Sequence, residues 1–383
     1  MSNAVVNGLA GAGGGIIAQI ITYPLQTVNT RQQTDRVAKK GLLSSNSNSS
    51  SNSGTDSLSS QSHPPSHGGG TLMQILKVIR TEGWGGLYSG LKPSLFGTAA
   101  SQGIYYYFYQ IFKNKAEALA VARKKKGLGD GTVGMFSWLL VAAIAGSLNV
   151  LFTNPIWVLV TRMQTHTQAE TKIMEAKREA ILREAAATAP TSLMDVSTAL
   201  QDKLSKLDSI KPSPYGTAQA VREVYSEAGI KGFWKGIIPT LVMVCNPSIQ
   251  FMIYESLLKH LKAKRAATKQ SSKGVSALEV FLAGALAKLG ATVVTYPLLV
   301  VKSRLQAKQE IGGGNISLQY TGTVDAIVKM ICYEGLPSFY KGMSTKIVQS
   351  VFAASVLFMI KEELVKAFHI LLDKIPKAIP KSQ

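Results

Sequence analysis

The stretch YPLQTVNTRQQ at residues 23–33 places an arginine seven residues after a proline, and this pattern occurs three times in the chain. The other two copies are NPIWVLVTRMQ at 154–164 and YPLLVVKSRLQ at 296–306. The three prolines are Pro24, Pro155 and Pro297. A proline inside a helix removes one backbone hydrogen bond and bends the helix. Three bends at equivalent places in apolar segments predict three helices that converge at one end of a bundle and close it there.

A second shared phrase follows each copy of this pattern. The three versions are EGWGGLYSG from Glu82, EAGIKGFWKG from Glu227 and EGLPSFYKG from Glu334. In each, an acid and a glycine precede a pair or near-pair of aromatic residues and a closing glycine, and a long apolar run comes next. Because this compound order occurs three times, the sequence predicts three tandem repeats of two helices each.

The apolar segments are long enough to cross a bilayer, which takes about 20 residues. We expect six spans, at about 4–33, 91–114, 133–163, 236–261, 276–306 and 343–370. Small residues in these segments let membrane helices approach closely. Polar residues at depth must face a partner or a water-filled cavity, because lipid cannot solvate them. The predicted fold is an all-α membrane protein, a pseudo-threefold bundle of six transmembrane helices in three tandem two-helix repeats around a central cavity.

The predicted repeats cover residues 1–118, 119–265 and 266–372, followed by a tail at 373–383. Residues 41–70 are polar and of low complexity, which predicts a disordered insert. Residues 166–213 form a second, polar insert with a charged stretch of apolar spacing, which predicts a surface helix over the gate or a long linker. Both inserts lie on one membrane side. The basic run ARKKKG at 122–127 lies on the other side, which the positive-inside rule makes cytosolic.

Composition limits the class of function. The chain has 42 Lys and Arg against 22 Asp and Glu, for a net charge of +20, yet only 17% of its residues are charged and 46% are hydrophobic. A soluble nucleic-acid binder of this charge would be more charged and less apolar, so we expect no nucleic-acid partner. The sequence has no glycine-rich phosphate loop of the nucleotide hydrolases and no cluster with metal-ligand spacing. It predicts a membrane protein that handles anions, with no catalytic residue, metal or cofactor.

These motifs resemble those of the mitochondrial carrier family, whose members have three tandem repeats of two helices. The family pattern is Pro-x-[Asp/Glu]-x-x-[Lys/Arg]-x-[Lys/Arg], then acid-Gly, then aromatic-[Lys/Arg]-Gly. NPIW at 154–157 and IQFMIYE at 249–255 are similar to the nucleotide-carrying branch, which includes NAD, flavin, folate and pyrimidine nucleotide carriers. The resemblance implies a secondary transporter and not an enzyme. It implies an antiporter that imports NAD in exchange for AMP or ADP, by alternating access around one central site.

Other functions stay open on the sequence. Within transport, the alternative is a carrier of coenzyme A, ADP/ATP, or FAD- or folate-type substrates. From another class, the alternative is a membrane scaffold on a carrier fold that does not transport. The resemblance implies a multi-pass protein of the peroxisomal membrane, with the mitochondrial inner membrane as the alternative. It also implies a functional monomer surrounded by membrane lipid, with an import receptor for peroxisomal membrane proteins as a candidate partner.

The chain departs from the family at the inner gate, where six positions form a ring of salt bridges between repeats. The residues there are Gln26, Asn29, Trp157, Val160, Leu299 and Lys302. The family's pairing joins Gln26 with Val160, Trp157 with Lys302, and Leu299 with Asn29, so no pair is ionic. Only Trp157 and Lys302 could interact strongly, through a cation–π contact of about 0.5–2 kcal/mol. We therefore expect a weak gate held by packing and by the bracing glutamines Gln33, Gln164 and Gln306.

The second basic position of the pattern is intact, with Arg31, Arg162 and Arg304. For these arginines we expect roles at helix ends and at the membrane interface.

The outer gate of the family follows [Phe/Tyr]-[Asp/Glu]-x-x-[Lys/Arg] on the even helices. Here Gln110, Glu255 and Glu362 take the acidic place, and Lys113, Leu258 and Val365 take the basic one. By the family's pairing only Glu362 and Lys113 could form a bridge. With charges missing from both gates, we expect a low barrier between the two states of the carrier.

The resemblance places the substrate site midway across the membrane. Its candidate residues are Lys288, Gln19, Gln102, Ser101, Tyr105, Met243, Asn246, Gln349, Ser350 and Lys346. Lys288 is the first candidate for binding phosphate, because a lone lysine in a span is costly unless it meets water or an anion. Snorkelling or pairing with another helix is the alternative for Lys288, and Lys302 and Lys346 rank second as phosphate ligands. Tyr105 could stack on a base or pack against lipid.

Overall fold

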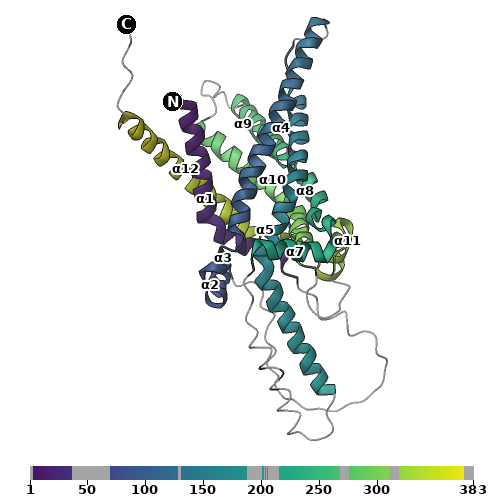
Figure 1. Ribbon diagram of the computed structural model, residues 1–383. Helices are drawn as coiled ribbons and strands as arrows, with labels where there is room; N and C mark the ends of the chain where they lie inside the picture. Colours follow the sequence, from purple (N-terminus) through teal and green to yellow (C-terminus); the bar gives the residue numbers. More distant parts are fainter. Residues whose placement is uncertain are drawn as a thin grey trace.

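The computed structural model describes residues 3–36, 70–127, 131–187, 201, 203, 205, 215–267, 276–309 and 319–374. In this part of the chain every regular element is a helix (Figure 1). The predicted insert at 41–70 lies outside the described residues except for Gly70, and so does most of the tail at 373–383. Of the second predicted insert, little beyond residue 187 is described.

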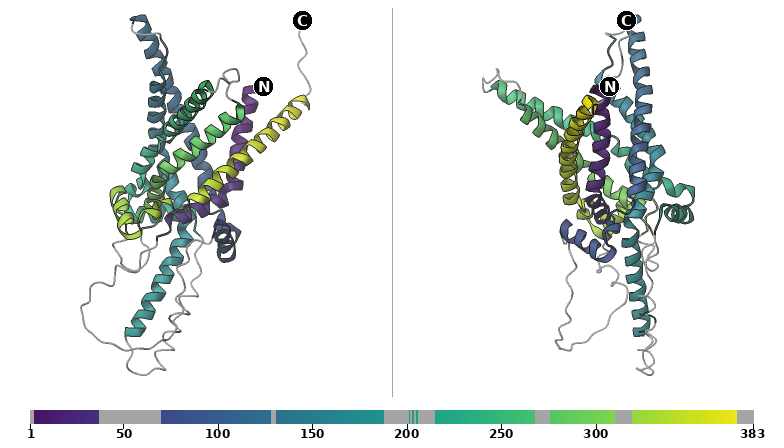
Figure 2. Two further views of the ribbon diagram at one scale, coloured as in Figure 1. Left: turned by 180° about the vertical axis from the view of Figure 1, so that it is seen from behind. Right: turned by 60° about the vertical axis from the view of Figure 1, so that its left-hand side comes forward.

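Long helices form the bundle. They are α1 (Asn3–Thr34), α4 (Leu91–Lys125), α5 (Met135–Ala187), α8 (Ile237–Met243), α9 (Asn246–Ala267), α10 (Ala277–Gln306) and α12 (Met343–Lys374). Helix α4 packs along α5, α8 and α9 pack along α10, and α12 packs along α1. Each even-numbered predicted span thus packs against the odd-numbered span that follows it in the chain. The sixth span packs against the first, so the helices form a closed bundle (Figure 2).

Three helical segments in the described part of the chain are both long and apolar enough to cross a membrane. They are Met135–Leu182, Ile230–Arg265 and Leu278–Gln306. These segments overlap the third, fourth and fifth predicted spans. Helices α1, α4 and α12 are long enough, at 32, 35 and 32 residues. Helix α1 is rich in glycine and glutamine and α4 in tyrosine and lysine, which makes both less apolar.

Helix α5 differs from the predicted boundaries. We expected a span at 133–163 and a separate surface helix or linker in the insert, but one helix of 53 residues runs from Met135 to Ala187. No glycine or proline occurs between Pro155 and Ala187, and the extension is rich in Ala, Glu, Lys and Arg, which favour helix. The extension projects from the converging end of the bundle (Figure 1).

The fourth predicted span is also different, because it is divided. Helix α8 ends at Met243, residues 244 and 245 form a turn, and α9 begins at Asn246. Pro247 follows at once, and a proline has no N–H to continue the hydrogen bonds of the preceding helix. Proline is tolerated in the first turn of a helix, where α9 places it.

The kinked helices are anchored by the residue that precedes each proline. The hydroxyl of Tyr23 donates to Ser89 O over 3.0 Å, the amide of Asn154 donates to Phe233 O over 2.9 Å, and the hydroxyl of Tyr296 donates to Lys341 O over 2.8 Å. Each acceptor lies in the acid-Gly-aromatic-Gly phrase next along the chain. The two repeated motifs therefore meet in space at the same level of the bundle.

Short helices cover the end where α1, α5 and α10 converge (Figure 1). They are α2 (Thr71–Glu82), α3 (Trp84–Leu87), α7 (Thr217–Ala228), η1 (Ile230–Trp234), α11 (Thr323–Lys329), η3 (Met330–Glu334) and η4 (Leu336–Tyr340). After them, the closing glycines Gly90, Gly236 and Gly342 adopt φ of +80°, +74° and +80°. A Cβ on Gly90 would lie 3.3 Å from Val160 O, and one on Gly236 would lie 3.2 Å from Lys302 O. These glycines allow a close approach between the phrase and the next kinked helix.

Candidate functional site

Three buried arginines form the most regular polar layer of the molecule. Arg31 pairs with Glu82 at 2.5 Å, Arg162 with Glu227 at 2.5 Å, and Arg304 with Glu334 through both guanidinium amino groups. The arginine side chains are 9%, 2% and 0% exposed. Arg31 and Arg304 lie in the last turns of α1 and α10, as expected of helix-end residues, but all three arginines are buried and not exposed at a membrane interface. A guanidinium removed from water needs a carboxylate partner, and the acid of the following phrase supplies it.

The same arginines also join neighbouring helices. Arg31 Nε donates to Gln164 O at 2.8 Å, Arg162 Nε donates to Gln306 O at 3.0 Å, and Arg304 Nε donates to Gln33 O at 3.0 Å. These bonds run from α1 to α5, from α5 to α10, and from α10 back to α1. The three arginines thus tie the converging ends of the kinked helices into a closed ring, which we call the arginine ring.

The bracing glutamines lie buried between the kinked helices. Gln33 Nε2 donates to Asn29 Oδ1 at 2.6 Å and to the hydroxyl of Tyr296 at 3.3 Å, and Ser303 Oγ donates to Gln33 Oε1 at 2.7 Å. Asn29 Nδ2 donates in turn to Gly342 O at 2.7 Å. At this junction, side-chain amides of α1 hold α10 and the start of α12 in place of an ion pair.

The other two glutamines have different surroundings. Gln306 Oε1 accepts from Thr161 Oγ1 at 3.1 Å, and its Nε2 lies 3.4 Å from Asn154 Oδ1, so this amide joins α10 to α5. Gln164 is buried beside the hydroxyl of Tyr23. Its Nε2 has no hydrogen-bond partner within the described part of the chain.

The other predicted inner-gate residues form no ion pair among the residues that the structure describes. Val160 is buried, whereas Gln26, Leu299 and Trp157 are half-buried. The expected cation–π contact between Trp157 and Lys302 is not formed. Where the structure describes side chains, such contacts occur for Arg36 on Tyr320 and Lys113 on Trp138. Trp157 and Lys302 instead line a common pocket.

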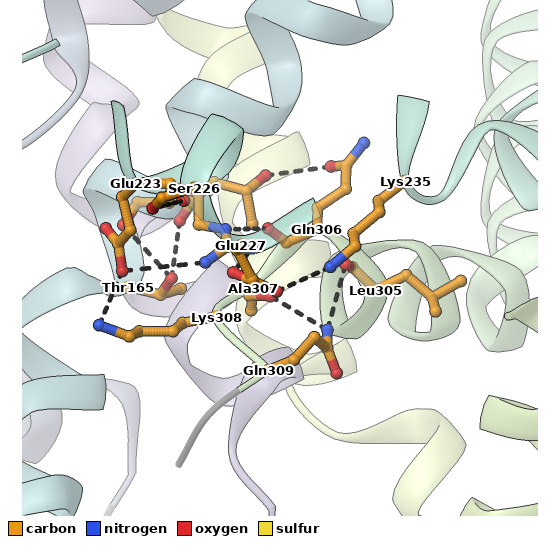
Figure 3. Close-up of polar contacts among 12 residues, drawn as sticks. Thr165, Glu223, Ser226, Glu227, Lys235, Leu305, Gln306, Ala307, Lys308 and Gln309 are labelled. Carbon is orange, nitrogen blue, oxygen red and sulfur yellow. Dashed lines mark hydrogen bonds and ion pairs between the residues drawn. The ribbon is translucent and has the colours of Figure 1, made fainter. Parts of the chain in front are cut away.

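Charged contacts between helices occur one layer beyond the gate, at the level where the extension of α5 begins. Lys172 Nζ lies 2.5 Å from Asp35 Oδ1, which joins the α5 extension to the end of α1. Lys308 Nζ lies 2.7 Å from Glu223 Oε1, which joins the end of α10 to α7. Figure 3 shows the Lys308 side chain reaching Glu223. Sequence reasoning missed these contacts because none of the four residues belongs to a repeated motif.

Glu223 is the centre of the second contact. It accepts a hydrogen bond from the hydroxyl of Tyr215 and forms an ion pair with Lys308, and Arg162 lies 4.0 Å away. Burial raises the pKa of Glu223, but the hydrogen bonds from Lys308 and Tyr215 and the charges of Lys308 and Arg162 outweigh burial and lower the pKa below its usual value. Glu223 therefore stays ionised at neutral pH and holds the cation of α10.

Three predicted phosphate ligands lie near one another on α10 and α12. Lys346 is close enough to Lys288 for their charges to repel, and Lys302 is likewise close to Lys346. Lys288 is exposed, whereas Lys302 and Lys346 are half-buried. Lys346 Nζ donates to Gln349 Oε1 at 3.3 Å. No carboxylate among the described residues pairs with any of these lysines, so the cluster suits a negatively charged ligand.

The other predicted site residues have different surroundings. Gln19 and Asn246 bind neighbouring helices, since Gln19 Nε2 donates to Ser94 Oγ at 2.9 Å and Asn246 Nδ2 to Thr295 Oγ1 at 3.2 Å. Tyr105 stacks on Tyr109 with ring centroids 5.8 Å apart. Ser101 lines the same pocket as Lys302. Gln102 is exposed, and Met243 and Ser350 are half-buried.

The predicted outer gate is not closed by its described residues. Gln110 Nε2 donates to Asn114 Oδ1 at 3.0 Å, Lys113 lies 4.0 Å from Glu117, and Glu255 lies 3.3 Å from Lys259, so each contact stays within one helix. The side chain of Glu362, and with it the expected bridge to Lys113, lies outside the described residues. Helices α4, α9 and α12 diverge at this end (Figure 2).

Comparison with known proteins supports the family resemblance that the motifs indicate. A family model described as "Mitochondrial carrier protein" matches residues 1–118, 180–265 and 273–370. The chain is 59% identical, over 97% of its length and 98% of the relative, to the "Peroxisomal nicotinamide adenine dinucleotide carrier" of Arabidopsis thaliana. It is 27% identical, over 95% and 93%, to "Peroxisomal membrane protein PMP34" of Mus musculus. It is 26% identical, over 94% and 79%, to "Nicotinamide adenine dinucleotide transporter 2, mitochondrial" of Arabidopsis thaliana. The chain belongs to the mitochondrial carrier family, and it is a transporter and not an enzyme.

Proposed function

We propose that this chain is an antiporter of the peroxisomal membrane that imports NAD in exchange for AMP or ADP. The observation that carries the proposal is 59% identity, over nearly the full length of both chains, to a protein named as a peroxisomal NAD carrier. A further relative over most of the chain is named as an NAD transporter, and the mouse relative as a peroxisomal membrane protein. Two of the three names support NAD transport and two support the peroxisomal membrane, whereas the second NAD transporter is named as mitochondrial.

The transporter has six spans in three tandem repeats, at 1–118, 119–265 and 266–372. Two observations support this architecture. The long helices contact one another in a closed order, with α4 on α5, α8 and α9 on α10, and α12 on α1. The arginine ring repeats the same bonds three times, from each kinked helix to the next. A cyclic set of equivalent contacts is what three copies of one unit around a common axis would produce.

The substrate binds at one central site midway across the membrane. The cluster of Lys288, Lys346 and Lys302 supports this proposal, because three cations lie together without a carboxylate among the described residues. Phosphate oxygens would neutralise these charges. Gln349 and Ser350 on α12 and Ser101 and Gln102 on α4 supply hydrogen-bonding groups. Gln19 and Asn246 position the helices around the site through their contacts with Ser94 and Thr295.

Alternating access follows from the two ends of the bundle. At one end the arginine ring and the bracing glutamines hold α1, α5 and α10 together, whereas at the other end α4, α9 and α12 diverge (Figure 1). In this state the site faces the side on which α1 begins and α12 ends. Transport then requires the ring-side contacts to open while the diverging helices close.

Uptake of labelled NAD into liposomes that contain the purified carrier tests the proposal. The liposomes are preloaded with AMP, with coenzyme A, or with buffer alone. We expect uptake with AMP inside and none with buffer alone, since an exchanger needs a counter-substrate. Uptake only against coenzyme A would replace NAD/AMP exchange with a coenzyme A carrier. No uptake with any preload, from protein that melts cooperatively, would favour a non-transporting scaffold.

A further inference from the structure

A small polar pocket lies beside the inner gate, and we call it the basal pocket. It has a volume of about 80 Å³. Among the residues that line it are Ser101, Asn149, Thr153, Trp157, Thr240 and Lys302. These side chains come from α4, α5, α8 and α10, so the pocket lies between four helices of the bundle. Two of its walls, Trp157 and Lys302, are gate positions of the family pattern.

The basal pocket contains polar groups without partners. Lys302 is half-buried, and within the described part of the chain it forms no hydrogen bond or ion pair. The charge of Lys346 nearby adds repulsion. Asn149 Oδ1 is buried and finds no hydrogen-bond partner among the described residues. A partly desolvated cation beside an unsatisfied amide is costly, and a ligand that supplies the missing contacts would remove this cost.

The hydrogen-bonding groups of the pocket that have no partner indicate which kind of ligand it can bind. The hydroxyls of Thr153 and Thr240 already donate to Asn149 O and Gly236 O, each at 2.7 Å. The donors left for a ligand include the ammonium of Lys302, the hydroxyl of Ser101 and the indole N–H of Trp157, which suit an oxyanion. Asn149 Oδ1 can accept from the Lys302 ammonium or from the hydroxyl of a singly protonated phosphate.

The size of the pocket narrows the choice further. A cavity needs about 10–15 Å³ of such volume to hold one water molecule, so the basal pocket of about 80 Å³ has room for one phosphate group. A terminal phosphate can enter a pocket of this size. The diphosphate of NAD cannot, because a ribose is attached on each side of it.

We propose that the basal pocket binds the terminal phosphate of the nucleotide exchanged for NAD, with Lys302 as its counter-ion. The internal diphosphate of NAD binds instead to Lys288 and Lys346, above the pocket. This inference deepens the proposed function and rests on it for the identity of the two substrates. Lys302 then acts as a ligand for the outgoing nucleotide, and not as the gate cation that the family pattern would make it.

Binding to the purified full-length carrier, measured by calorimetry, tests the inference with AMP, adenosine, NAD and inorganic phosphate. AMP should bind and adenosine should not, because only AMP has the phosphate. Lys302→Gln should weaken AMP binding by about tenfold or more and NAD binding by less than about threefold. Inorganic phosphate should compete with AMP in the wild type and no longer in Lys302→Gln. The control is Lys77→Gln, which removes an equal charge from an exposed position on α2 and should change neither affinity.

The stability of the variants is measured in the same samples. Lys302→Gln removes a cation without a carboxylate partner, so its melting temperature without ligand should equal or exceed that of the wild type. Should it instead melt lower, Ser101→Ala gives a second measurement, with an expected loss of AMP affinity of about threefold. AMP affinity within about twofold of the wild type in both variants would overturn the inference. An equal loss for NAD and AMP would also overturn it.

The inference and the proposed function can fail separately. A carrier that binds AMP through Lys302 but neither binds nor transports NAD would keep the phosphate site and exclude NAD. A carrier that transports NAD while adenosine binds as tightly as AMP would keep NAD transport and exclude the phosphate site.

Discussion

The arginine ring lies two to five residues after the gate positions along each kinked helix, yet the two layers are built differently. Arg31, Arg162 and Arg304 each bind the acid of the following phrase and a glutamine carbonyl of the next helix. The six gate positions share no chemistry, since two amides, a lysine and three apolar side chains occupy them. The difference follows from burial of charge. Each buried guanidinium requires a full set of partners, whereas five of the six gate residues are uncharged and only need to pack and separate.

Substitutions in the arginine ring should therefore cost more folding stability than substitutions in the gate layer. Glu334→Gln leaves the guanidinium of Arg304, which is 0% exposed, without its carboxylate. We expect a loss of about 3–5 kcal/mol in the free energy of unfolding, because an uncompensated charge stays buried. Thermal melting of the purified carrier measures it. The control is Asp325→Asn, which breaks a partly exposed ion pair with Lys329 and should cost about 1 kcal/mol or less. Equal melting temperatures for the two variants would remove the distinction between the ring and an ordinary surface pair.

Substitutions in the gate layer should lower the free energy of unfolding less than substitutions in the arginine ring. They should also lower it by different amounts at equivalent positions of the three repeats. Gln33→Ala removes hydrogen bonds to Asn29, Tyr296 and Ser303, and should cost about 1–3 kcal/mol. Gln164→Ala alters the equivalent position on α5 but removes a buried Nε2 that has no partner in the described part of the chain. It should cost clearly less than Gln33→Ala in the same melting experiment. A larger loss for Gln164→Ala would contradict the unequal bracing.

This contrast also marks what sequence could predict. The repeated prolines predict three helices that meet at one end, and α1, α5 and α10 do so. The partners of the arginines could not be found by spacing, because Glu82 lies 51 residues after Arg31 and Glu334 lies 30 residues after Arg304. A long-range pair of this kind depends on how the intervening segment folds. Three acids at equivalent places in the three phrases were the available signal.

The boundaries of α5 and the surroundings of Lys302 show two other limits of prediction from the sequence. The absence of glycine and proline between 156 and 187 could have predicted one continuous helix, but the change from apolar to charged residues favoured a boundary. The motif places Lys302 at the gate, and the sequence ranks it only second as a phosphate ligand. Its pocket depends on Ser101, Asn149 and Thr240, which come from three other helices and share no pattern with it.

Substitutions in the charged layer beyond the gate should have the smallest effect, and the contribution of Glu223 should depend on pH. The pKa of Glu223 is lowered in the folded carrier, so its ionised form stabilises the fold above the usual value of 4.5, and this stabilisation is lost as the pH falls through the folded pKa. Glu223→Gln should therefore melt below the wild type at pH 7, and the two should converge as the pH falls below 4.5. Melting curves from pH 7 downward measure the difference. A gap that stays constant over this range would mean that Glu223 acts through packing, and the contact with Lys308 would then hold α10 to α7 without its charge.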